Sequence, residues 1–217
     1  MTVSEISDRP TFRPELSNCR FCAIEERESP LLNTPDMMVF PSVGSLVEGW
    51  LLIAPKRHVI TLSELTGAER TSFQDVVDRV GQIVGAKYGK FVTFEHGPAT
   101  AGRSAGCGVD HAHLHVVPTV ANLVGGARAI HPVGARLTWK QAVWPWDARQ
   151  DHESGMDYLY LCDQNGVGSI AAAPEIPSQL FRRVIAGHLG HDKWDWNADP
   201  RMSTYEDTAD RLRTEFI

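Results

Sequence analysis

The chain has 217 residues, 42% of them hydrophobic and 22% charged, which is the composition of a globular protein able to bury its own core. Its formal net charge of -6 is opposite in sign to the basic surplus of proteins whose main task is to coat nucleic acid. No segment resembles a signal peptide or a membrane span, so we expect a cytoplasmic protein that binds neither nucleic acid nor a membrane.

The N-terminal part predicts an arm followed by a cysteine pair. Residues 1–18 are polar and contain two prolines, which indicates little structure of their own. Cys19 and Cys22 form a C-x-x-C pair, and three interpretations are open: metal ligands, a redox pair, or two small buried thiols. The redox interpretation is the least favoured, because no thioredoxin-like strand and helix surround the pair.

Two short apolar runs then predict neighbouring strands. Met37–Phe40 and Trp50–Ala54 are rich in large apolar side chains, and a turn region from Gly44 to Gly49 separates them. We expect both strands to lie in a buried sheet.

A long amphipathic helix is predicted over residues 67–88. Its apolar residues recur at steps of three and four, and polar residues fill the positions between them. Thr66 and Glu69 fit a capping box at its start.

Phe91–Phe94 and Leu114–Val117 predict two further strands, with a glycine-rich loop between them. The order strand, strand, helix, strand, loop, strand indicates an α+β fold with a mostly antiparallel sheet and a packed amphipathic helix. We expect a catalytic domain over residues 1–128 and a C-terminal α/β extension over residues 129–217, packed on the core.

The extension predicts one strand pair and two helices. Tyr158–Cys162 and Gly168–Ala172 read as strands joined by a turn at residues 163–166, and helices are expected at about residues 178–188 and 204–216. Five of the chain's six tryptophans lie beyond residue 138, which indicates that the region is folded.

The most informative motif is the alternation of His111, His113 and His115. Alternate residues of an extended strand point to the same face, so three imidazoles would line one edge of a site. The pattern fits a metal site, a catalytic cluster, or a solvated strand without function. The preceding Gly106 and Gly108 leave backbone N–H groups open to phosphate oxygens, which favours the catalytic interpretation.

These motifs together resemble the histidine triad superfamily. The run His111-Ala112-His113-Leu114-His115-Val116-Val117 fits the family pattern of three histidines alternating with apolar residues. The segments 18–24, with Cys-x-Phe-Cys, and 51–65, with Pro-Lys-x-His, resemble the family's opening and its strand-turn-helix segment. The resemblance covers about residues 17–120.

The resemblance implies a role for each matching residue. His113 corresponds to the nucleophile that takes the nucleotidyl group from the α-phosphate, and His115 to the histidine that helps the leaving group depart, with His111 completing the catalytic set. Cys107 and Gly108 fall in the phosphate-binding loop. The presence of His115, where related uridylyltransferases place Gln, favours hydrolysis over transfer to a sugar phosphate.

A structural zinc ion is also implied. Cys19, Cys22, His58 and His111 would complete a Cys₂His₂ set, as in the zinc-bearing members of the superfamily. Such a site would tie the N-terminal arm to the catalytic loop.

Two positions depart from the family pattern. Ser42 stands near the place of an acidic residue that binds the ribose, and His96 stands where family members often carry an Asn near the phosphate. Trp50, Met38 and Phe40 are interpreted as core residues rather than as contacts to a base. Arg182 and Arg183 are interpreted as exposed, solvated charges rather than phosphate ligands.

The leading hypothesis is a nucleotide hydrolase that forms a nucleotidyl-His113 intermediate and releases a nucleoside monophosphate. The alternatives are a nucleotidyltransferase or phosphorylase that uses the same intermediate, and a non-catalytic nucleotide-binding module. A homodimer is expected from the resemblance alone.

Overall fold

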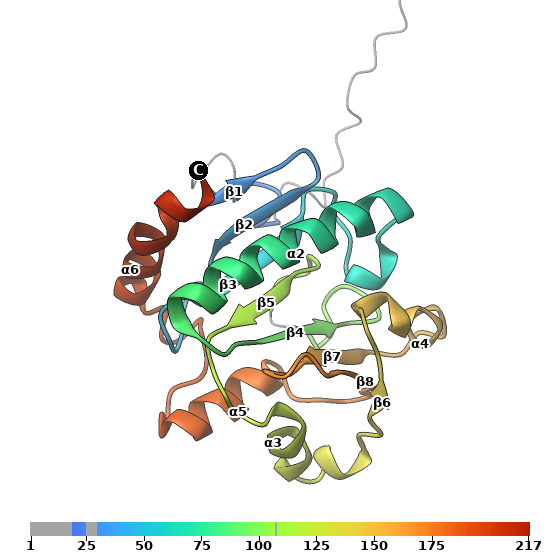
Figure 1. The fold of residues 1–217 in the computed structure, drawn as a ribbon. Helices are drawn as coiled ribbons and strands as arrows, with labels where there is room; N and C mark the ends of the chain where they lie inside the picture. Colours follow the sequence, from blue (N-terminus) through green and yellow to red (C-terminus); the bar gives the residue numbers. More distant parts are fainter. Residues whose placement is uncertain (1–18, 25–29, 107) are drawn as a thin grey trace, which may run out of the picture.

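The computed structural model describes residues 19–24, 30–106 and 108–217 (Figure 1). The arm expected over residues 1–18 and the expected phosphate-loop residue Cys107 lie outside these ranges. The described chain contains an eight-stranded sheet in the order β1-β2-β3-β5-β4-β7-β8-β6. Its described strand pairs are all antiparallel, which confirms the predicted α+β class.

The elements have the following bounds in chain order: β1 (Leu32–Asn33), β2 (Met37–Pro41), β3 (Leu51–Pro55), the 3-10 helix η2 (Leu62–Glu64), α2 (Gly67–Tyr88), β4 (Val92–Gly97), β5 (Leu114–Val117), α3 (Leu123–Ala129), η3 (Gly134–Arg136), β6 (Lys140–Gln141), η4 (Pro145–Ala148), α4 (Arg149–Glu153), β7 (Tyr158–Cys162), β8 (Gly168–Ala172), α5 (Leu180–Leu189), α6 (Met202–Leu212) and η5 (Arg213–Phe216).

The turn between β2 and β3 depends on glycine. Gly44 has a φ of 70°, a region that only glycine adopts readily, and a Cβ there would lie 2.6 Å from the Cβ of Trp196. The glycine therefore permits the segment around Trp196 to pack closely against this turn. The antiparallel pairing of β2 with β3 confirms the predicted pair of strands.

Helix α2 covers one face of the sheet. Thr66 and Glu69 form the predicted capping box at its N-terminus. Phe73, Val80 and Val84 are fully buried against that face, and each such side chain contributes about 2 kcal/mol through removal of apolar surface from water. Figure 1 shows α2 lying across the strands in front of the sheet.

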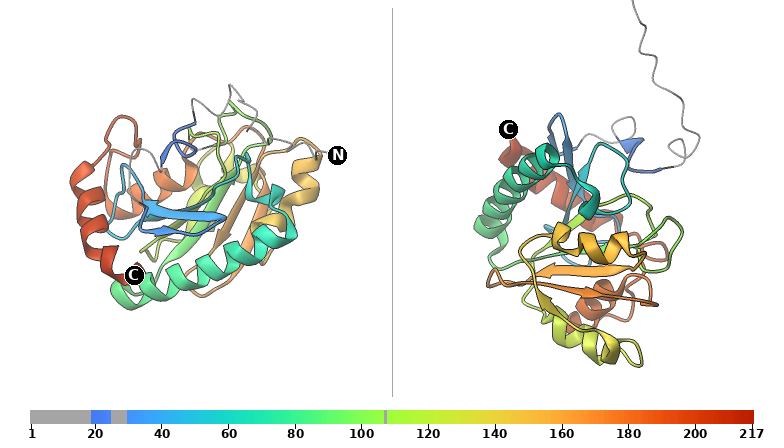
Figure 2. Two further views of the ribbon diagram at one scale, coloured as in Figure 1. Left: turned by 90° about the horizontal axis from the view of Figure 1, so that it is seen from above. Right: turned by 90° about the vertical axis from the view of Figure 1, so that its right-hand side faces the viewer.

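The opposite face packs against the C-terminal part of the chain. Phe181 and Ile185 of α5 belong to a core cluster with Phe94 of β4 and Leu159 of β7. Two further views show α2 and α6 placed around the strands (Figure 2).

The sheet continues from one half of the chain into the other. β7 pairs with β4 over five residues, and β7 and β8 form the predicted hairpin around the turn at Asp163–Gly166. The predicted division at residues 128 and 129 thus falls between strands of a single sheet, and it stays a prediction.

Seven short elements of the described chain were not predicted: β1, η2, α3, η3, β6, η4 and α4. The α3 sequence Leu-Val-Gly-Gly-Ala-Arg-Ala contains two glycines, which disfavour a helix, but Asn122 caps it by accepting the Gly125 N–H at 2.8 Å. Among the described residues no helix is long and apolar enough to cross a membrane.

Candidate functional site

The side chains of the three histidines, of which His115 alone lies in β5, point to two different places. β5 lies between β3 and β4, with His115 opposite Leu52 on one side and Phe94 on the other. His113 and His115 line a cavity on the sheet face that α5 covers, and their ring centroids are 4.8 Å apart. The ring of His111 turns instead toward the cysteine pair.

The tautomer of His113 follows from its hydrogen bond. Its Nδ1 lies 2.7 Å from the carbonyl oxygen of His111, and a carbonyl oxygen only accepts, so Nδ1 donates its proton there. Burial lowers the pKa of His113 to about 4, against the opposing effect of the His111 carbonyl. At neutral pH the ring is therefore uncharged, and its Nε2 holds the lone pair that a nucleophile needs.

His115 has the opposite arrangement. The indole Nε1–H of Trp50 donates to its Nδ1 at 3.0 Å, and the ring of Phe94 stacks on it with centroids 4.4 Å apart. Its pKa is lowered by burial first and then by the charges of His113, His96 and Arg182.

The cavity beside these two histidines is lined mainly by apolar side chains and by two basic ones. Its described lining contains two arginines and no acidic residue. The lining residues are Arg20, Phe21, Ile24, Phe40, Pro41, Ser42, Val43, Leu52, Val109, His113, His115, Arg182 and Trp196.

The interpretation of Arg182 as an exposed charge was wrong. Its side chain extends from α5 into the interior and is only 1% exposed. The guanidinium lies over the Trp50 ring at 4.7 Å from the centroid, and it donates to the carbonyl oxygens of Trp194 at 3.0 Å and of Gly44. Arg183 is half-buried, with its guanidinium 3.5 Å from the Trp194 ring centroid.

The other expected substrate-binding residues occupy different places. Ser42 lines the cavity. His96 is buried beside His115, and its Nε2 accepts the Phe181 N–H at 3.3 Å; it does not contribute to the described lining. Gly108 lines an adjoining cavity that shares Arg20, Val109 and Trp196 with the first.

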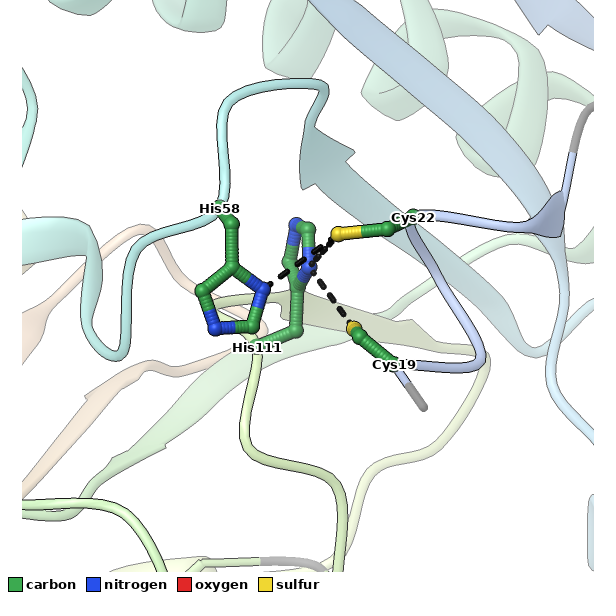
Figure 3. Close-up of side chains that lie close together, drawn as sticks. All are labelled: Cys19, Cys22, His58 and His111. Carbon is green, nitrogen blue, oxygen red and sulfur yellow. Dashed lines mark hydrogen bonds between the residues drawn. The ribbon is translucent and has the colours of Figure 1, made fainter. Parts of the chain in front are cut away.

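Cys19, Cys22, His58 and His111 converge at one point, as Figure 3 shows. Cys19 Sγ lies 3.3 Å from His111 Nδ1, and Cys22 Sγ lies 3.3 Å from His58 Nδ1. All four donor atoms lie within 4.8 Å of one another. The Ala112 N–H donates to the Val59 carbonyl at 2.7 Å, which holds together the two loops that carry the histidines.

The donor set fits a tetrahedral zinc ion. The usual zinc–sulfur and zinc–nitrogen bond lengths place neighbouring donors roughly 3.5 Å apart in a tetrahedron, close to the separations observed. The Nε2 of His111 lies 2.8 Å from the Pro55 carbonyl oxygen and donates to it, which leaves Nδ1 free of a proton for a metal. Burial and Cys19 raise the pKa of Cys22 to about 12, so the thiolate form requires a cation close by.

Sequence reasoning did not identify Trp50 or Arg182 as parts of the site. Both lie more than sixty residues along the chain from the nearest histidine of the run. The residue types alone could have suggested them, since a buried tryptophan usually finds a partner for its N–H and arginine stacks on aromatic rings.

Comparisons with known proteins agree with the motif. Residues 24–122 match the HIT domain family. The chain is 30% identical over 105 residues to an uncharacterized HIT-like protein of Mycobacterium tuberculosis, and the match covers 46% of this chain and 70% of that protein. It is 31% identical over 93 residues to the nitrilase and fragile histidine triad fusion protein NitFhit of Caenorhabditis elegans, covering 43% of this chain but 21% of that protein.

A solved structure has a similar part. The hypothetical histidine triad nucleotide-binding protein from Sulfolobus tokodaii superposes with a TM-score of 0.40 and 24% identity, covering 46% of this chain and 68% of that one.

Proposed function

The chain belongs to the histidine triad family, and from that premise we propose that it is a nucleotide hydrolase that cleaves at the α-phosphate and releases a nucleoside monophosphate. The observation that carries the proposal is the arrangement of His113. Its Nδ1–H is committed to the His111 carbonyl at 2.7 Å, and its Nε2 lone pair belongs to a ring that lines a cavity with two arginines.

The proposed reaction has two steps, transfer of the nucleotidyl group to His113 and its hydrolysis. First, the Nε2 lone pair of His113 bonds to the α-phosphorus, and the bond from phosphorus to the leaving group breaks with its electron pair departing on the leaving group. The His111 carbonyl, held against Nδ1–H, stabilises the positive charge that the ring gains. Water then attacks phosphorus, the P–N bond returns its electron pair to His113, and the proton of water passes to solvent.

The surroundings of His113 suit a negatively charged phosphate. Arg20 and Arg182 line the same cavity, and no acidic side chain is found in the part of the lining that the structure describes. Arg182 is held by backbone carbonyls in a largely water-free position, where its positive charge acts more strongly than at a solvated surface.

We further propose that Cys19, Cys22, His58 and His111 hold a structural zinc ion. When bound, zinc supplies a cross-link between the N-terminal turn and the two histidine-bearing loops, and its four positions are filled by protein ligands. His111 would then serve catalysis through its backbone carbonyl, which orients His113, while its ring binds the metal.

Intact-protein mass spectrometry after brief mixing with substrates tests the covalent step. The panel contains dinucleoside polyphosphates, nucleoside phosphoramidates and sugar nucleotides. We expect a mass increase of one nucleotidyl group in the wild-type protein and none in His113→Ala, together with a loss of turnover of at least about 10³-fold, because removal of a nucleophile typically costs that much or more.

His188→Ala provides the matched control, because His188 is an exposed histidine outside the cavity. It should form the adduct and release monophosphate like the wild type. An adduct that persists in His113→Ala, or turnover retained at more than a few per cent, would show that His113 is not the nucleophile.

A further inference from the structure

The hydrogen bond from Trp50 determines where His115 carries its proton. An indole nitrogen donates and never accepts, so the contact of 3.0 Å requires a lone pair on His115 Nδ1. The neutral ring then has its proton on Nε2. Trp50 is fully buried, so water does not compete for this hydrogen bond.

The charged groups around His115 disfavour its protonation. Besides burial, the described groups that lower its pKa are His113, just before β5, His96 from β4 and Arg182 from α5, and no acidic side chain is among them. Protonation at Nδ1 would also set an N–H of His115 against the N–H of Trp50, which would break a buried hydrogen bond and leave both donors without an acceptor.

Arg182 and Trp50 act as one unit. The guanidinium lies 4.7 Å from the Trp50 ring centroid, and its hydrogen bonds to the carbonyls of Trp194 and Gly44 fix it there. The cation holds the indole in place and adds a positive charge next to His115. These contacts join a residue of the C-terminal segment to a histidine of the central strand.

We propose that Trp50 and Arg182 are positioning residues that keep His115 as a neutral Nε2–H hydrogen-bond donor, so that the site acts on substrates whose leaving group departs without receiving a proton. The inference rests on the proposed function, and it specifies the class of bond cleaved. A phosphoric anhydride fits, because its leaving group departs as a phosphate anion that carries the electron pair of the broken P–O bond. A phosphoramidate fits poorly, because an amine leaving group needs a proton as its P–N bond breaks.

Nitrogen-15 NMR of histidine-labelled protein measures the tautomer directly, without any substrate. We expect the wild-type His115 signals to show a protonated Nε2 and an unprotonated Nδ1, with no titration between pH 6 and 9. Trp50→Phe keeps an aromatic ring but removes the N–H, and it should give a mixture of tautomers. Trp139→Phe is the matched control, because the Trp139 Nε1 has no hydrogen-bond partner among the described residues.

Two substrates that share one nucleoside test the chemical consequence. Wild-type kcat/KM for a dinucleoside polyphosphate should exceed that for a nucleoside phosphoramidate by at least about 100-fold, which is the lower range of what proton transfer contributes. The anhydride kcat should be flat between pH 6 and 9. In Trp50→Phe the kcat should acquire a dependence on pH in this range, with a smaller change in KM. Arg182→Gln should show the same dependence of kcat on pH together with a higher KM, because it also removes a positive charge from the cavity lining.

The outcomes distinguish failure of the His115 assignment from failure of the proposed hydrolase function. A proton on Nδ1 of His115, or a charged His115 at pH 7 in the wild type, overturns the assignment whether or not the variants fold. Phosphoramidate turnover equal to that of the anhydride overturns the substrate class. If the wild-type protein turns over none of the substrates but shows the expected tautomer, and the tautomer changes in the variants, the proposed function is contradicted while the roles of Trp50 and Arg182 are supported.

Discussion

Glu95 lies on the sheet face that α2 and η2 cover, fully buried and away from the histidine cavity. Its Oε1 accepts the Leu62 N–H at 2.7 Å, and its Oε2 accepts the Tyr158 hydroxyl at 2.6 Å. Burial raises the pKa of Glu95 to about 8, against the opposing effect of these two hydrogen bonds. The carboxyl is therefore largely neutral in the folded protein at pH 7.

The stability of the fold should consequently decrease as the pH rises. Below pH 4.5 the Glu95 carboxyl is protonated in both the folded and the unfolded chain. Between pH 4.5 and about pH 8 it ionises in the unfolded chain alone, which stabilises the unfolded state. The free energy of unfolding should lose roughly 3 to 5 kcal/mol from this residue across that window. Urea unfolding at pH 5 and pH 8 measures the effect.

Glu95→Gln removes the ionisation and keeps the shape, so its unfolding free energy should depend less on pH than that of the wild type. The exposed Glu153 supplies the control, since Glu153→Gln should leave the pH dependence unchanged. If Glu95→Gln and wild type follow parallel curves between pH 5 and 8, Glu95 is ionised in the folded protein.

For single residues, the sequence indicated the positions that stand out through local spacing. The pattern of His113 and His115, the cysteine pair and the Thr66 capping box could all be read from spacing, because these residues act through near neighbours or a repeating motif. Arg182 could not be placed, because an arginine in a helix reads as solvated until Trp50 and the carbonyl of Gly44 are known to face it.

At the scale of elements, the turn that carries Cys19 and Cys22 belongs to none of the described strands. Within the described part of this turn, the Ala23 N–H donates to the Cys19 carbonyl oxygen at 3.2 Å and the Ile24 N–H donates to the Phe21 carbonyl oxygen at 3.3 Å. Its position beside β5 depends on Phe21, which packs on Phe40 and His113, and on the four-residue donor cluster.

We expect purified protein to contain about one zinc ion per chain and Cys19→Ser to lose it. Because the ion would bind the folded state alone, its loss should lower the Tm by about 5 to 10 °C, corresponding to a few kcal/mol in a chain of this size. Elemental analysis and thermal unfolding with and without a chelator measure both effects.

Cys162→Ser is the comparison variant, because Cys162 is half-buried at the end of β7 and outside the cluster. It should retain the metal and the Tm of the wild type. Purified wild-type protein that contains no metal, or whose Tm is unchanged by a chelator, would rule out the structural zinc site.

The longer elements could be predicted because their periodicity is strong and their ends carry turn residues. The strands of the two hairpins and α2 lie where the apolar patterns indicated. The elements α3, α4 and β6 have two to seven residues, and tertiary contacts rather than propensity stabilise segments this short.

At the scale of the whole molecule, the sheet makes the two halves of the chain interdependent. β4 belongs to the first half and bonds to β7 of the second along its length, and the core around Phe94 includes Phe181 and Leu161. Removal of residues 130–217 would expose an edge of the sheet and this apolar surface together.

A chain ending at residue 129 should therefore fail to form a cooperatively folded monomer. Circular dichroism and NMR dispersion would show a partly folded or aggregated species, while coexpression with a fragment of residues 130–217 should restore solubility. A soluble 1–129 fragment that unfolds cooperatively would show that the histidine-bearing part folds without the rest. The expected homodimer stays a prediction at this scale.

The placement of β5 has a consequence for motion. This strand is hydrogen-bonded on both sides, by β3 and β4, whereas Arg20 and Trp196, which line the cavity, lie in turns. Amide hydrogen exchange should thus be slowest along β5 and faster around Arg20 and Trp196. We therefore expect substitutions at Arg20 or Trp196 to change which ligands bind while leaving the backbone around the histidines in place.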